Sequence, residues 1–227
     1  MKKQFLIVGG TGSIGGAIAD EIFSHSHSVV ITGKKELDVT NEESIRDFFS
    51  SFPSFDGMVY AVGSCPPKGY MKEIETPLSK IDVSRLSTDF NLHVVGLLRV
   101  VQQMKGVLKE SSPILVISSG ITRIPDCGCP ANLYAGHYAT IKASQNELVK
   151  WLRRDPFIRE KGILIHRLGV GAVDTPFHEG ASEELKPPIL YSLEEVAKRA
   201  IKALDSRKVV DYDFNPIFRL LVRKFLV

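Results

Sequence analysis

The sequence predicts a doubly wound α/β fold, in which one parallel sheet of about six or seven strands carries helices on both faces. Short apolar runs of strand character alternate with helical patterns along the chain. A glycine-rich turn joins the first of these runs to the first helix. Because crossovers between parallel strands are right-handed, the helices of such a chain wind onto both faces of the sheet.

The elements can be placed in order along the chain. The apolar runs expected to form strands are Gln4–Val8, Ser28–Thr32, Gly57–Val62, Pro113–Ser118, Ile163–Leu168 and Lys208–Tyr212. The patterns expected to form helices are Ser13–Phe23, Asn41–Ser50, Ser84–Lys109, Ala135–Arg153 and Leu193–Leu204. The second crossover is short, because little chain separates Thr32 from the helix at Asn41–Ser50. The irregular stretches Cys65–Lys80 and Thr175–Ser192 are long enough to cover a site.

Length and composition indicate a single domain over residues 1–227 with an amphipathic tail at 213–227, since 227 residues with 44% hydrophobic content can bury a sizeable core. The near balance of 29 basic and 26 acidic side chains gives no bulk electrostatic case for nucleic acid. Three cysteines argue against a disulfide framework and fit a reducing compartment. Neither a signal-peptide pattern nor a membrane-spanning apolar stretch is present, so we expect a cytoplasmic protein without a metal site.

The turn at Gly9–Gly16 reads Gly-Gly-Thr-Gly-Ser-Ile-Gly-Gly and stands between a strand and a helix, which is the context of a dinucleotide-binding fingerprint. Both Gly10-x-Gly12-x-x-Gly15 and Gly9-x-x-Gly12-x-x-Gly15 fit, so the register stays open. The helix N-terminus would hold the pyrophosphate. This context predicts a Rossmann-type domain that binds its cofactor through Gly9, Gly10, Thr11, Gly12, Ser13, Ile14 and Gly15.

The tip of the second predicted strand indicates which dinucleotide is bound. Proteins that prefer NAD usually place an acid there for the ribose 2′-hydroxyl, but this chain has Thr32-Gly33-Lys34-Lys35. The two ammonium groups could neutralise a 2′-phosphate, so NADP(H) is favoured over NAD(H). Glu36 lies close enough to keep NAD(H) open.

Tyr138 and Lys142 are four residues apart on a predicted helix, so their side chains share one face. A nearby ammonium favours the phenolate, and we expect Lys142 to lower the pKa of Tyr138 toward the range useful for acid–base catalysis. The pair begins the helix that follows the strand ending in Ser118 and Ser119.

Together these motifs resemble the short-chain dehydrogenase/reductase family. The resemblance is carried, in order, by "GGTGSIGG", "LDVTN", "YAVG", "DFNLHVVG", "ISSG", "YATIK" and "VGAVDTPF". It implies that Tyr138 is the catalytic acid/base, that Lys142 lowers its pKa and binds the nicotinamide ribose, and that Ser119 orients the substrate. It also implies that Asn91 holds a water of the proton relay. Ser118 is the alternative to Ser119.

The resemblance extends to cofactor and substrate contacts. It implies that Asp38 and Val39 flank the adenine, that Ala61 and Gly63 lie along the cofactor, and that Val173 and Thr175 contact the carboxamide. Ser118, Tyr134 and Phe177 are the expected substrate contacts. The stretch before Tyr138 is longer than usual in the family, and Val170-Gly171 replaces the usual Pro-Gly, which leaves the substrate open.

These features favour an NADP(H)-dependent oxidoreductase acting on a carbonyl or secondary alcohol. The alternatives are a non-catalytic NAD(P)-binding regulatory or redox-sensing protein and, ranked lower, a sugar-nucleotide-modifying member of the family. Relatives pair through the helix at Ser84–Lys109 and the helix of Tyr138, so a homodimer or homotetramer is expected. The basic apolar tail is expected to dock on the domain or a partner subunit, with membrane contact as the weaker alternative.

Overall fold

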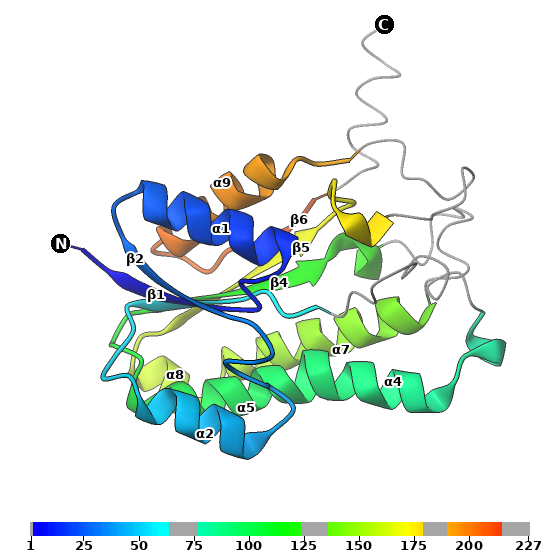
Figure 1. The fold of residues 1–227 in the computed structure, drawn as a ribbon, viewed down its shortest axis with the longest axis horizontal. Helices are drawn as coiled ribbons and strands as arrows, with labels where there is room; N and C mark the ends of the chain where they lie inside the picture. The colour runs from blue at the N-terminus through cyan, green and yellow to red at the C-terminus, as the bar shows by residue number, and fades with distance from the viewer. Residues whose placement is uncertain (1, 64–76, 124–135, 179–189, 215–227) are drawn as a thin grey trace, which may run out of the picture.

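The computed structural model describes residues 2–63, 77–123, 136–178 and 190–214. Its centre is a six-stranded sheet in the order β2-β1-β3-β4-β5-β6, with every neighbouring pair parallel (Figure 1). The strands are β1 (Gln4–Val8), β2 (Ser28–Thr32), β3 (Gly57–Tyr60), β4 (Pro113–Ser119), β5 (Leu164–Val170) and β6 (Asp211–Asp213). The predicted fold class is therefore confirmed.

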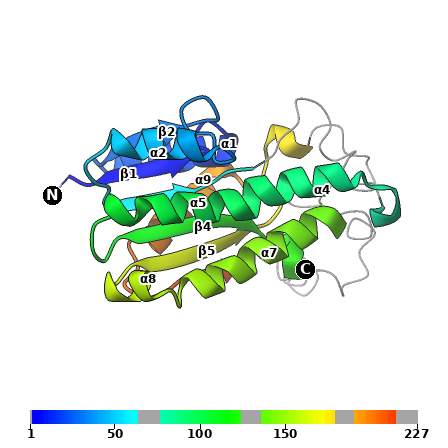
Figure 2. The same cartoon turned by 90° about the horizontal axis from the view of Figure 1, so that it is seen from below.

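Helices cover both faces of the sheet (Figures 1 and 2). One face carries α1 (Ser13–Ser24) and α9 (Leu193–Leu204), which pack against each other. The other face carries α2 (Glu42–Ser50), α4 (Val83–Phe90), α5 (Gly96–Gln103), α7 (Gly136–Leu152) and α8 (Pro156–Glu160). In the described part of the chain, no helix has the length and apolar character needed to cross a membrane.

Side chains of the strands alternate between two cores, one on each side of the sheet. Along β1, Leu6 and Val8 enter the core beneath α2, α5 and α7, whereas Phe5 and Ile7 enter the core beneath α1 and α9. Because both faces are covered, the central strands are apolar at nearly every position. This burial explains why continuous apolar runs in the sequence locate the strands.

Local hydrogen bonds set where several helices begin. The Asn41 side chain accepts from the backbone N–H groups of Glu43 and Ser44 at the start of α2. Ser192 and Glu195 form a reciprocal capping box at the start of α9. Such caps satisfy backbone N–H groups that have no partner inside the helix, and each contributes about 1 kcal/mol.

The helix predicted at Ser84–Lys109 is not a single α-helix: the helical segment runs from Val83 to Gly106 and changes its hydrogen-bond pattern along the way. After α4 the backbone forms a π-helical turn at Asn91–Val95, then α5, and then a 3₁₀ turn at Met104–Gly106. At the π turn, the buried Tyr60 hydroxyl donates a hydrogen bond of 2.9 Å to the Leu92 carbonyl. Tyr60 lies on β3, so this contact could not be predicted from the local apolar pattern.

The end of the chain also differs from the prediction. β6 covers Asp211–Asp213 rather than Lys208–Tyr212, and the Phe214 ring is buried against Tyr191 with 4.7 Å between ring centroids. The amphipathic tail therefore cannot begin at residue 213, because Asp213 and Phe214 belong to the folded domain. Residues 215–227 lie outside the described residues.

The buried guanidinium of Arg167 on β5 ties β6 to the sheet. Its Nε lies 2.8 Å from Asp211 Oδ1, and its Nη1 lies 2.6 Å from Asp213 Oδ1. Arg153, which follows α7, also donates to Asp211. These ion pairs hold a three-residue edge strand that could contribute little stability alone.

The position of β1 defines where a ligand could bind. The chain leaves β1 toward β2 on one side of the sheet, while β3 lies on its other side. In open α/β sheets, ligands occupy the crevice beyond the carboxyl ends of the strands at such a switch point. The glycine turn after β1 lies at that end.

Candidate active site

The glycine turn has a backbone that larger residues could not adopt. Gly9 has φ +81°, and a Cβ there would lie 2.9 Å from backbone atoms of Ala61. A Cβ on Gly15 would lie 2.4 Å from the Gly9 carbonyl oxygen, so α1 starts in close contact with the end of β1. Gly12, by contrast, faces outward, and its nearest atom to an added Cβ is 3.5 Å away. The two registers differ at Gly9 and Gly10; a Cβ on Gly10 would also be crowded, 2.7 Å from Ile31 Cγ2, but Gly9 is the one of the two with a positive φ.

The start of α1 is open in a way that suits a phosphate. Gly12 is the N-cap residue, and no side chain caps the first N–H groups of the helix. Thr11, Gly12 and Ser13 are exposed, and Ile14 is partly buried against the core. An uncapped N-terminus presents N–H donors and the positive end of the helix dipole. This cradle fits the pyrophosphate of a dinucleotide.

The tip of β2 combines the exposed side chains of Lys34 and Lys35 with a hydrogen-bonded carboxylate, Asp38. The Lys34 side chain is 85% exposed, and its Nζ lies 3.9 Å from Asp38 Oδ2. Asp38 Oδ1 accepts from the backbone and hydroxyl of Thr40; partial burial acts to raise its pKa, but these bonds outweigh it and lower the pKa. Val39 is buried in the core, so its side chain is not available to a ligand.

Ser119 and Tyr138 are brought together at the end of β4. Ser119 is the last residue of β4, and its hydroxyl shares a hydrogen bond with Tyr138. Burial raises the pKa of Tyr138 to about 12, although the Ser119 bond acts to lower it. The pKa therefore lies above its ordinary value and not below it, contrary to what the tyrosine–lysine spacing predicts, because burial outweighs the Ser119 bond and the Asp89 carboxylate adds to the increase.

Lys142 lies on the same face of α7 as Tyr138, with its Nζ 5.9 Å from the centre of the phenol ring. The side chain is buried, and the ammonium donates to Gln145 Oε1 at 3.1 Å and to the Ile117 carbonyl at 3.5 Å. Its Nζ also lies 3.3 Å from His93 Nδ1. Burial lowers the pKa of Lys142 to about 7.

Two other polar side chains of the predicted site face elsewhere. The Asn91 carboxamide accepts a 2.7 Å hydrogen bond from Arg99, and its backbone carbonyl accepts the Gly96 N–H. Ser118 is buried and donates to Asn146 Oδ1 at 2.6 Å. Adjacent residues of a strand point to opposite faces, which explains why Ser119 and not Ser118 meets Tyr138.

The remaining predicted residues surround the same end of the sheet. Phe177 lies in a 3₁₀ turn, and its ring centroid is 6.0 Å from that of Tyr138. Val173 is buried, and its carbonyl accepts from the Thr175 hydroxyl. Gly63 is exposed beyond β3, with open space where a Cβ would stand. Tyr134 lies outside the described residues.

Sequence reasoning missed His93, Gln145 and Asp89, which are buried around Lys142. Gln145 is one helical turn from Lys142, so its place on the same face could have been found from spacing. His93 is 49 positions away, and nothing in the local pattern links it to Lys142. Within the described ranges, no group of His, Cys, Asp and Glu residues is arranged to hold a metal ion.

No protein-family model and no curated protein matches the sequence significantly. Solved structures, however, match its fold. One is a small-chain dehydrogenase in complex with NADPH, with a TM-score of 0.77 and 18% identity over 96% of this chain and 100% of that one. Another is a short chain dehydrogenase from Burkholderia cenocepacia in complex with NADP, with a TM-score of 0.77 and 12% identity over 100% of this chain and 93% of that one.

BdcA in complex with NADPH is a further match, with a TM-score of 0.68 and 17% identity over 93% of both chains. At sequence identities this low, structural similarity establishes a shared fold and not a shared activity. The order of the strands, the glycine turn after β1 and these superpositions agree, and the chain has the fold of the short-chain dehydrogenases.

Proposed function

We propose that this chain is an NAD(P)(H)-dependent oxidoreductase of the short-chain dehydrogenase/reductase type, acting on a carbonyl or secondary alcohol. The proposal rests on the placement of Ser119, Tyr138 and Lys142 at the sheet end that carries the open glycine turn. β1 and β4 are separated by one strand, so the turn and Ser119 lie about 10 Å apart across the sheet. Structures of like fold in complex with NADPH or NADP support this assignment.

The cofactor and the side chains of this chain would have different roles in the reaction. When bound, the nicotinamide supplies or accepts the hydride, and the protein handles the proton. With its pKa raised to about 12, Tyr138 keeps its proton at neutral pH and can donate it to a carbonyl oxygen. Ser119 is placed to orient that oxygen.

The cofactor would extend from the glycine turn to Tyr138. The N-terminus of α1 would hold the pyrophosphate. Asp38 and Val39 would flank the adenine. Ala61 and Gly63, which follow β3, would lie along the cofactor. Val173 and Thr175 would meet the carboxamide, and Phe177 borders the substrate position beside the Tyr138 ring.

A direct test of this function is to titrate the protein with NADPH and then to follow NADPH absorbance with a panel of aldehydes and ketones. We expect saturable binding and reduction of at least one carbonyl class. Binding without turnover on any substrate would instead support the non-catalytic regulatory alternative. That alternative has one observation in its favour: the Lys142 ammonium already donates to protein acceptors.

We propose NADP(H) as the preferred cofactor because Lys34 offers an exposed ammonium at the tip of β2. Lys34→Ala is expected to weaken NADPH binding on the order of tenfold, the loss of one charge-assisted hydrogen bond, and to leave NADH binding nearly unchanged. Fluorescence titration of both cofactors measures the two dissociation constants. The control is Lys161→Ala, which removes the same charge where Lys161 pairs with Glu110. Equal weakening for NADPH and NADH would refute the 2′-phosphate assignment.

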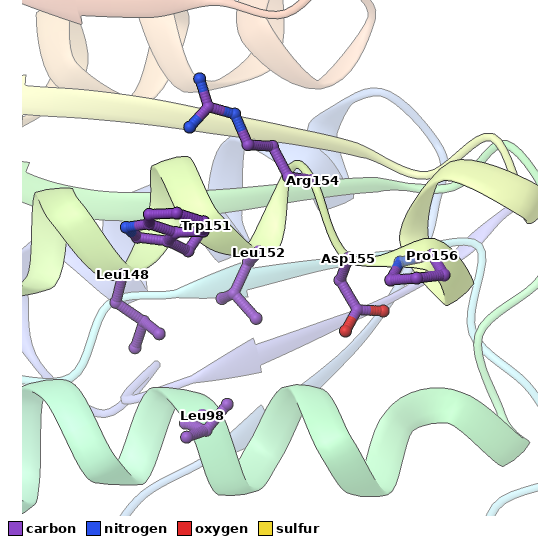
Figure 3. Close-up of a pocket in the computed structure, with 7 residues that line it drawn as sticks. All are labelled: Leu98, Leu148, Trp151, Leu152, Arg154, Asp155 and Pro156. Atoms are coloured by element: carbon purple, nitrogen blue, oxygen red, sulfur yellow. The ribbon is translucent and has the colours of Figure 1, made fainter.

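We also propose a homo-oligomer that pairs through the outer faces of α5 and α7. A shallow apolar groove lies between these helices, with Leu98 facing Leu148 and Leu152 (Figure 3). Trp151 borders the groove and is 61% exposed. Trp151→Glu is expected to convert a dimer or tetramer into monomers, because pairing would remove the new carboxylate from water and the apolar contact of the indole ring would be lost. Light scattering coupled to gel filtration measures the mass; a monomeric wild type, or a variant of unchanged mass, would contradict the proposal.

A further inference from the structure

A cluster of buried polar side chains surrounds Lys142 near the ring of Tyr138, and the proposed chemistry so far gives His93, Gln145 and Asp89 no role. His93, Gln145 and Asp89 are each at most 2% exposed, and Lys142 is 3% exposed. They come from three elements: α4, the π turn at Asn91–Val95, and α7. Burying polar groups costs free energy unless they form hydrogen bonds with one another. The hydrogen bonds that these side chains form therefore indicate what the cluster could do for the site.

The cluster is organised around the Lys142 ammonium. An ammonium has three protons to donate, and three acceptors stand within reach: Gln145 Oε1 at 3.1 Å, His93 Nδ1 at 3.3 Å and the Ile117 carbonyl at 3.5 Å. Gln145 also donates from Nε2 to the His93 backbone carbonyl at 3.0 Å, which fixes the π turn against α7. The His93 ring meets the Tyr138 ring edge to face, with 6.5 Å between centroids.

We propose that His93 is a positioning residue: its Nδ1 atom accepts a hydrogen bond from the Lys142 ammonium and so holds the ammonium near Tyr138. This inference rests on the proposed function, in which Lys142 and Tyr138 serve the reaction. The Nδ1 atom must then be unprotonated and the ring neutral, with its hydrogen on Nε2.

The charged groups around His93 agree with a neutral ring. Burial lowers its pKa well below 6.5, and the positive charges of Lys142 and Arg85 lower it further. Arg85 is paired with the buried Asp89 carboxylate at 3.1 Å. Asp89 in turn favours the charged form of Lys142 and the protonated form of Tyr138. The ring is therefore an acceptor and not a competing cation.

The π turn places His93, and not Asn91, beside the Lys142 ammonium. Asn91 binds Arg99, which also reaches Glu42 on α2, so the amide points toward the outer helix layer. Two residues later, the His93 ring is turned inward against α7. The family resemblance assigns the proton relay to Asn91, but in this chain Asn91 binds Arg99, and His93 contacts Lys142.

The test is a pH titration of Lys142 by carbon NMR in protein labelled at lysine Cε, without cofactor, with the resonance assigned from Lys142→Met. We expect the wild-type resonance to titrate near 7. His93→Leu removes an acceptor of the charged form and should lower this pKa by about one unit. His93→Gln, whose amide reaches past the Nδ1 position, should do the same. His93→Asn places an oxygen at the Nδ1 position and should restore the wild-type value.

Val94→Ala provides the matched control, since it alters a buried residue of the same π turn without touching Lys142. It should lower thermal stability and leave the Lys142 titration unchanged. An unchanged pKa in both His93→Leu and His93→Gln would overturn the proposal; if the leucine variant does not fold, the glutamine and asparagine variants decide. Because the titration needs no turnover, it stays decisive even if the wild type reduces no carbonyl, which would count against the proposed function alone.

Discussion

Tyr138→Phe is expected to reduce carbonyl turnover by about a thousandfold while NADPH binds as in the wild type. The substitution removes the hydroxyl that we propose donates the proton, and general acid catalysis of this kind contributes about 10²–10⁴-fold. The ring itself stays, so its contacts with His93, Phe177 and the Lys142 ammonium are kept. Steady-state NADPH consumption measures the loss, and fluorescence titration measures binding.

Tyr212→Phe is the control for this experiment. Tyr212 lies on β6, is 42% exposed and contacts Phe214 rather than the proposed site, so removing its hydroxyl should leave turnover unchanged. If Tyr138→Phe retained wild-type turnover, Tyr138 could not be the acid. Loss of turnover together with loss of NADPH binding would instead indicate that the phenol hydroxyl supports the binding site and not the proton transfer.

Arg167→Met is expected to lower the free energy of unfolding by about 2–3 kcal/mol, because it removes charge-assisted hydrogen bonds from a buried guanidinium to two partly exposed carboxylates. Arg167 is 3% exposed and binds both Asp211 and Asp213, the first and last residues of β6. Burial acts to raise the pKa of Asp211, but Arg167 and Arg153 outweigh it and lower the pKa; in the variant Arg153 remains as the partner of this carboxylate. Urea denaturation followed by circular dichroism measures the change.

Lys161→Met serves as the comparison, because Lys161 forms an exposed ion pair with Glu110. Exposed pairs contribute at most about 1 kcal/mol, so this variant should unfold close to the wild type. Equal stabilities of the two variants would show that the β6 network contributes no more than a surface pair. Restored stability in Arg167→Met combined with Asp213→Asn would show that the uncompensated carboxylate causes the loss.

Much of the fold can be predicted from local pattern. The apolar run Gln4–Val8 and the glycine turn after it identify β1 and α1, because a strand buried on both faces must be continuously apolar. The short second crossover also follows from chain length alone. The π turn at Asn91–Val95 cannot be predicted from local pattern, because it is accompanied by a hydrogen bond from Tyr60 on a distant strand. The helix α8, at Pro156–Glu160, is too short for a periodic pattern to reveal.

In the candidate site, too, some features follow from local sequence and others depend on tertiary contacts. Spacing alone places Tyr138 and Lys142 on one face of α7, and sequence order places both serines at the end of β4. Which serine meets the phenol depends on the face that each presents, and the sheet decides this by turning Ser118 toward Asn146. The direction of the Tyr138 pKa shift was mispredicted because the sequence shows a neighbouring ammonium but not the extent of burial.

By itself, the sequence determined the alternation of strands and helices, the glycine turn and the tyrosine–lysine pair. These depend on spacings of a few residues, which backbone geometry converts directly into faces and turns. Only the tertiary structure brought His93 to Lys142 across 49 positions, engaged Asn91 with Arg99, and withdrew the phenol and the ammonium from water. Those features depend on the packing of distant elements and on the low polarity of the interior, and neither is a property of any short stretch of chain.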